Sequence, residues 1–139
     1  MNASAPIIGE PAQATGPGEL PGLLHAHAAG RLAGTAAVNL LITHRYWLTH
    51  PGFTGAFVHP VTAADGRRVR AWIDWHAAIT ALDRGELPCT GSEAHLLRIA
   101  ASLAAGTPIS LREVLGGLDR TNIAAVTAAL TAANGTHPE

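Results

Sequence analysis

The stretch that decides the fold is residues 92–135, which read SEAHLLRIAASLAAGTPISLREVLGGLDRTNIAAVTAALTAANG. Polar residues that favour helix N-caps divide this stretch into three helices, expected over residues 93–105, 111–115 and 120–133. The three predicted caps are Ser92, Ser110 and Asp119. A glycine follows each helix, as is common where a helix closes in the left-handed backbone region. The spacing therefore predicts a C-terminal unit of three helices.

Apolar spacing predicts which faces of these helices form the core. Ile123, Val126 and Leu130 lie three and four residues apart, so they share one face of the last helix. On this basis we expect Ile123 and Leu130 to meet Leu103 and Leu118 in a common interior. The C-terminal unit would then bury its largest apolar side chains.

A β-hairpin is predicted just before this unit, within residues 56–73. Asp65-Gly66 separates two segments rich in β-formers, and this dipeptide favours the primed turns that match the twist of paired strands. The second strand alternates apolar and polar residues, which predicts that Arg68, Arg70 and Trp72 share its outer face. Arginine and tryptophan are enriched at binding hot spots, so these three residues are a candidate partner-binding patch. The alternative is that Trp72 is a core residue that anchors the hairpin.

The remaining chain predicts two further helices and a tail. A helix is expected over residues 36–48, weakened on its N-terminal side by Gly30 and Gly34. A second is expected over residues 75–83, capped by Asp74. Residues 1–22 are rich in Pro, Gly and Ala without an apolar period, and predict a flexible tail. The fold class is thus a mainly α domain over residues 23–135.

Residues 108–135, PISLREVLGGLDRTNIAAVTAALTAANG, resemble the helix-turn-helix of bacterial winged-helix regulators. The resemblance implies a recognition helix whose Arg120, Thr121 and Asn122 contact DNA. This chain departs from the pattern at Glu113 and Gly116, and no strand pair follows to form the wing. Residues 72–119 are also similar to small actinobacterial proteins of unassigned function, which implies a shared fold and no activity.

Charge leaves two function classes open. Charged residues make up 14% of the chain, against about 25% in an average soluble domain, and a weakly charged surface is easily buried against another chain. This favours a non-catalytic accessory or assembly protein that binds a protein partner or itself as a homo-oligomer. The alternative is a small DNA-binding regulator. Phosphate contacts need cationic side chains, and the C-terminal half has four arginines against five acids.

Other function classes find little support in the sequence. The eight histidines form none of the short-spaced pairs typical of zinc sites, and no phosphate-binding loop or paired carboxylates indicate an enzyme. Cys89 precedes a helix start, which can lower a thiol pKa, but a lone cysteine is more often a small buried apolar residue. We therefore expect no catalytic residues, metal or cofactor. One cysteine and no long apolar run predict a cytoplasmic protein without a membrane span.

Overall fold

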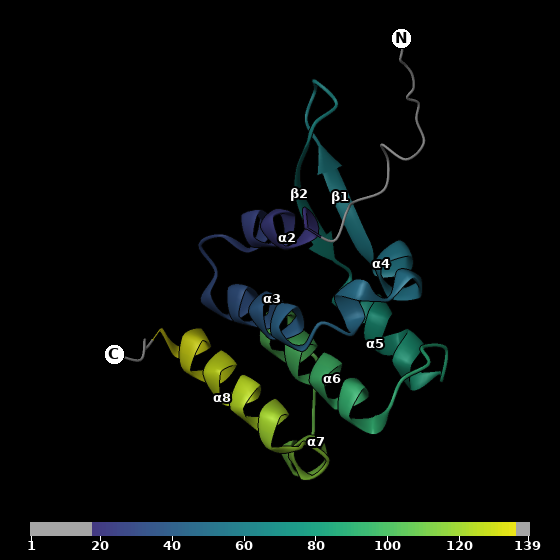
Figure 1. Ribbon diagram of the computed structural model, residues 1–139, viewed down its shortest axis with the longest axis vertical. Helices are drawn as coiled ribbons and strands as arrows, with labels where there is room; N and C mark the ends of the chain where they lie inside the picture. The colour runs from purple at the N-terminus through teal and green to yellow at the C-terminus, as the bar shows by residue number, and fades with distance from the viewer. Residues whose placement is uncertain (1–17, 136–139) are drawn as a thin grey trace.

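Helix α3 (Leu32–His44) runs through the middle of the computed structural model, which describes residues 18–135 (Figure 1). The predicted mainly α fold with a short hairpin is confirmed. The other elements, in chain order, are α2 (Leu20–Ala28), the 3-10 turn η2 (Trp47–Thr49), α4 (Pro51–Phe57), β1 (Val58–Thr62), β2 (Arg68–Ile73), α5 (Trp75–Asp83), α6 (Gly91–Ala105), α7 (Leu111–Gly116) and α8 (Arg120–Asn134). Most of the predicted tail, residues 1–22, lies outside the described residues, but its last three residues belong to α2, where Leu20 is buried.

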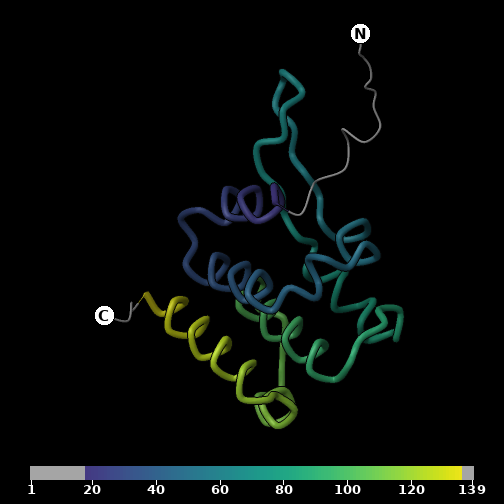
Figure 2. Tube along the Cα trace, in the orientation of Figure 1, coloured from purple at the N-terminus to yellow at the C-terminus, as the bar shows by residue number. Residues whose placement is uncertain are grey.

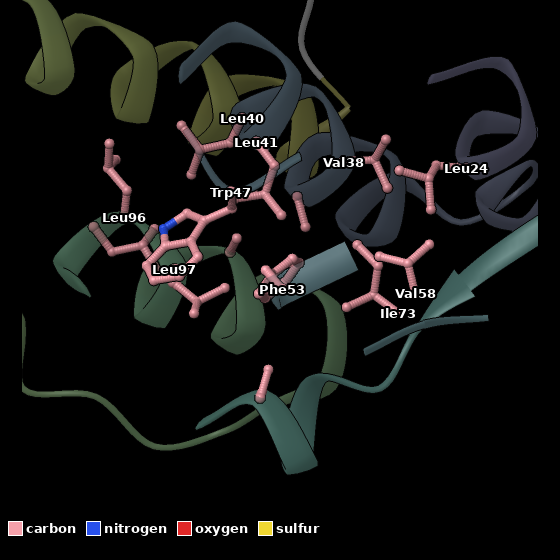
Figure 3. Close-up of a cluster of buried hydrophobic side chains, with 14 of the residues drawn as sticks. Leu24, Val38, Leu40, Leu41, Trp47, Phe53, Val58, Ile73, Leu96 and Leu97 are labelled. Carbon is pink, nitrogen blue, oxygen red and sulfur yellow. The ribbon is translucent and has the colours of Figure 1, made fainter. Parts of the chain in front are cut away.

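The core centres on Trp47, which has no exposed surface (Figure 3). Its indole Nε1 donates a hydrogen bond to the backbone carbonyl of Glu93 at 2.8 Å, so the one polar atom of the ring is satisfied. Its ring lies 5.3 Å from that of Phe53, centroid to centroid, which is typical of packed aromatic pairs. Leucines of α3 and α6 surround this pair because α3 packs directly against α6.

The single helix predicted over residues 36–48 is wrong at both ends. The chain turns at Gly30, whose φ of 86° suits glycine, and α3 begins at Leu32. It ends at His44, because Arg45 adopts a φ of 78° in the same left-handed region. The turn at Arg45 directs the following segment inward and delivers Trp47 to the core.

The predicted hairpin is confirmed, with β1 and β2 antiparallel and Val58 paired with Ile73. The predicted primed turn is wrong, since such a turn needs a positive φ at Asp65, and Gly66 alone has one there. Gly66 instead donates its N–H to the carbonyl of Ala63 at 2.9 Å, and the Asp65 carboxylate accepts from the N–H of Arg67 at 3.0 Å. The carboxylate bond explains why Asp65 suits this loop without a left-handed backbone.

Helix starts follow the predicted polar caps with one shift. Asp74, Ser110 and Asp119 each accept the N–H of the residue three positions ahead, as predicted. For α6 the predicted cap is wrong: Thr90, and not Ser92, caps the helix in a reciprocal box with Glu93. Thr90 wins because Glu93 stands three residues after it, where its carboxylate reaches back to the Thr90 N–H at 2.8 Å.

The predicted interior of the C-terminal unit is also wrong. Leu103 and Leu118 are half-buried against the core, whereas Ile123 and Leu130 are exposed. Val126, of the same predicted face, is buried as expected, together with Ala129, where α8 packs against α3. Small side chains let two helices approach closely, so the packing with α3 selects the alanine face of α8 and turns its largest side chains outward.

Candidate functional site

A candidate interaction surface lies on the exposed flank of α8, beside its buried face; we call it the α8 stripe and define it as Ile123, Thr127 and Leu130. These residues lie four and three positions apart, so they line one side of the helix for two turns. Leu130 is 51% exposed and Ile123 is 37% exposed. Figures 1 and 2 place α8 at the outer edge of the molecule, with α3 on its inner side.

The polar groups of the α8 stripe are satisfied within the helix. The hydroxyl of Thr127 donates to the carbonyl of Ile123 at 2.8 Å, and that of Thr131 donates to the carbonyl of Thr127 at 3.0 Å. Covering this surface with another chain would therefore leave no buried hydroxyl without a partner. Such a surface accepts an apolar neighbour at little polar cost.

Further exposed apolar side chains lie near the two ends of the α8 stripe. Leu32 is 55% exposed, and its Cδ1 lies 3.3 Å from the position a Cβ would occupy at Gly135, just past the end of α8. Leu111 and Leu115 are exposed on α7, which precedes α8 (Figure 1). Apart from Trp72, every large exposed apolar side chain in residues 18–135 thus lies on α7, on α8 or beside its end.

Charge is nearly absent from the same helix. Arg120, in the first turn, is the one charged residue among the 15 of α8. Alanine and threonine make up most of the helix, and Ile123 and Leu130 are its two exposed large apolar side chains. This weakly charged, partly apolar surface is the candidate site.

The residues predicted to contact DNA lie at the start of α8. Arg120 and Thr121 are exposed, and Asn122 is half-buried and gives its backbone N–H to the cap residue Asp119 at 2.8 Å. Helix α6 packs against α7 and, less extensively, against α8, but the main partner of α8 is α3, so the three C-terminal helices do not form a unit of their own. Within the described residues α8 is the last element, and the hairpin precedes these helices rather than following them.

The hairpin brings together only part of the predicted partner-binding patch. Arg70 and Trp72 are exposed on one face of β2, whereas Arg68 is half-buried and lies on the other face, because the register shifts between Val61 and Thr62. The indole of Trp72 lies 4.7 Å from the ring of His59, its partner across the hairpin. Trp72 is 39% exposed, so the alternative placement in the core does not hold for it. Binding by this patch stays a prediction.

The described side chains form neither a cluster of metal ligands nor an activated thiol. Over residues 18–135, no three His, Cys, Asp or Glu side chains come close enough together to hold a metal ion. Burial raises the pKa of the Cys89 thiol, which leaves it protonated near neutral pH and works against any lowering by the helix that follows. The described residues therefore contain no cluster of metal ligands, and the Cys89 thiol is not activated.

No family model, curated protein or solved structure matches the chain. Among the described helices, none combines the length and apolar character needed to cross a bilayer.

The apolar spacing predicts that Ile123 and Leu130 lie in the interior, whereas both are exposed. The alanines beside Val126 mark the face of α8 that packs against α3. A prediction that ranks apolar residues by size places leucine and isoleucine there instead.

Proposed function

We propose that this protein is a non-catalytic assembly protein that pairs with a second copy of itself through the α8 stripe. The observation that carries this proposal is the exposure of Ile123 and Leu130 on a helix that has no charge beyond its first turn. A partner of opposite charge would find little to bind here. A second copy of the same uncharged surface is complementary to it.

The spacing of the α8 stripe suits a two-fold axis. Ile123 and Leu130 lie about 10.5 Å apart along the helix, with Thr127 near the midpoint. Two antiparallel copies of α8 that cross at Thr127 would place Ile123 of each copy against Leu130 of the other. This is the isologous arrangement of symmetric dimers. Ala124 and Thr131 beside the stripe allow the helices to approach closely.

The size of the surface sets the expected strength. A 15-residue helix is about 22 Å long, and one face of it covers less than the ~800 Å² per partner of a typical interface. Leu32 and the α7 leucines near its ends would enlarge the contact. Each half-exposed leucine or isoleucine gains about 1 kcal/mol when it is fully covered. We therefore expect a weak, reversible dimer.

Light scattering coupled to gel filtration tests the proposal directly. The chain should move toward twice its own mass as its concentration rises, and the double variant Ile123→Asp/Leu130→Asp should stay monomeric at every concentration. The matched control is Ala128→Asp, which adds the same charge to an exposed position about 140° around the helix from Ile123. A wild-type monomer throughout, or equal loss of the dimer in the control, would refute the α8 interface.

A DNA-binding regulator is a second candidate function, favoured by the succession of α6, α7 and α8 and by the exposed Arg120 at the start of α8. Its test is a mobility shift with random duplex DNA at about 50 mM salt, where non-specific phosphate contacts are strong. Binding that is lost in Arg120→Ala supports this function. Absence of any shift under these conditions removes it.

A further inference from the structure

A cavity of about 190 Å³ lies between α2, the start of α3 and the end of the hairpin, apart from the α8 stripe and bordered by Trp72 of the hairpin patch. Most of its lining is apolar or aromatic, with Leu24, Val38, Trp72 and Trp75 among the contributors. Figure 3 shows the side chains of Leu24 and Val38 close together at this end of the core. For scale, a cavity of about 150 Å³ in another protein holds benzene. The space therefore fits one ring with a small substituent.

The polar part of the cavity is cationic. Its lining includes His27 and Arg31, and none of the lining residues described is an Asp or Glu. The guanidinium of Arg31 donates one hydrogen bond, to the backbone carbonyl of His27 at 2.7 Å, out of the five N–H groups it carries. The positive charge of Arg70 also reaches His27. These charges favour an anionic group inside the cavity.

The ring of His27 adds a second, independent indication. Its Nδ1 is buried and has no hydrogen-bond partner, which is costly for a polar atom, and the ring must turn before this nitrogen can face the cavity. Burial lowers the pKa of His27, and the nearby arginines Arg31 and Arg70 lower it further, so the imidazole is mainly neutral at pH 7. A neutral imidazole has one nitrogen that donates and one that accepts.

We propose that this cavity binds a small aromatic carboxylate, a single flat ring bearing one negative group. The ring would lie against the indoles of Trp72 and Trp75, where aromatic contacts are favourable. The carboxylate would accept hydrogen bonds from the guanidinium of Arg31 and from the imidazole of His27. The site stands apart from α8, so its test is independent of the test for self-association.

Benzoate is the probe, and the indole N–H signals of the three tryptophans in a 1H–15N NMR spectrum are the readout. The signals of Trp72 and Trp75 should shift in a saturable way, while that of Trp47, buried and bonded to Glu93, should stay in place. Benzyl alcohol, which has the ring without the charge, and cyclohexanecarboxylate, which has the charge without the flat ring, should each bind about tenfold more weakly. Equal binding of either compound, or no saturable shift with benzoate, overturns the proposal.

Two variants separate binding from folding. Arg31→Gln removes an exposed charge and should weaken benzoate about tenfold, as expected for loss of a charged hydrogen bond, while the control Arg112→Gln on α7 should change nothing. His27→Leu removes the unpartnered nitrogen, so it should keep or raise the melting temperature and still weaken binding. If Arg31→Gln and His27→Leu both bind benzoate as the wild type does, the assignment is wrong.

Discussion

Large apolar side chains are buried in the core around Trp47 but partly exposed on the C-terminal helix α8. Near Trp47, the aromatic and leucine side chains of several elements are fully covered, and the indole N–H has a backbone partner. On α8, alanines and Val126 face α3, while Leu130 and Ile123 face outward. The first region holds the fold together within one chain. On α8, apolar surface stays exposed in the single chain. This exposure is the basis for proposing contact with a second copy.

The sharpest way to break this comparison is to remove one large side chain from each region. Trp47→Ala should lower the free energy of unfolding by about 3–5 kcal/mol, because it opens a cavity and abandons a hydrogen bond. Leu130→Ala should change it by less than about 1 kcal/mol, since the side chain is half exposed. Chemical denaturation followed by circular dichroism, at a dilution where the protein is monomeric, measures both. Similar losses for the two variants would mean that the regions do not differ.

A second pair of variants tests which face of α8 packs inward. Val126→Ala should destabilise the monomer by about 2 kcal/mol because its side chain is buried against the core. Ile123→Ala, one turn away on the outer face, should cost a few tenths of a kcal/mol. Thermal melts of dilute protein report the difference. A loss for Ile123→Ala as large as that for Val126→Ala would mean that Ile123 is buried, as the apolar spacing predicts.

Helix caps give a smaller effect that compares the same two regions. Thr90→Ala breaks the reciprocal box with Glu93 beside the Trp47 core, and Asp119→Ala removes the cap of α8. Each should lower the free energy of unfolding by about 1 kcal/mol. Amide hydrogen exchange should locate the loss for Asp119→Ala in α8 and that for Thr90→Ala in α6. Exchange that spreads evenly over both helices in either variant would contradict separate regions.

The smallest expected effect is a dependence on pH that arises outside α8, which contains no histidine or acidic residue. Burial lowers the pKa of His44, outweighing Glu93 and Asp119, which raise it, and burial also lowers the pKa of His27. The unfolded chain therefore binds more protons below about pH 6.5, so the free energy of unfolding should fall as the pH drops through that range.

Denaturation midpoints between pH 7 and pH 5 measure this decline. The double variant His27→Gln/His44→Gln should flatten it, and the control His76→Gln, an exposed position on α5, should not. An unchanged slope in the double variant would show that neither buried imidazole contributes.

These contrasts also show what could be predicted from the sequence. Features governed by neighbours along the chain were predicted well: the caps at Asp74 and Asp119, the α5 helix and the hairpin all depend on residues within a few positions. The end of α3 at Arg45 could not be predicted from the sequence. The positive φ of Arg45 turns the chain so that Trp47 packs in the core, and this packing depends on residues far away in the sequence.

The face of α8 was mispredicted for a related reason. Periodicity alone ranks leucine and isoleucine above alanine as core residues, and it carries no information about how closely a neighbouring helix approaches. Once α3 lies against α8, small side chains fit between them and Leu130 does not. The sequence analysis did not single out the cavity residues His27 and Arg31. It predicted neither α2, which carries His27, nor the turn at Gly30 that precedes Arg31.

The central claim, that two copies meet at Thr127, is tested most directly by a cysteine placed on the proposed axis. In a Cys89→Ser background, Thr127→Cys should form a covalent dimer under mild oxidation, since a disulfide needs Cα atoms within about 7 Å. Ala128→Cys, one residue further round the helix, should remain largely monomeric on a non-reducing gel. Equal cross-linking at both positions, or none at Thr127→Cys, would contradict a two-fold contact between α8 helices.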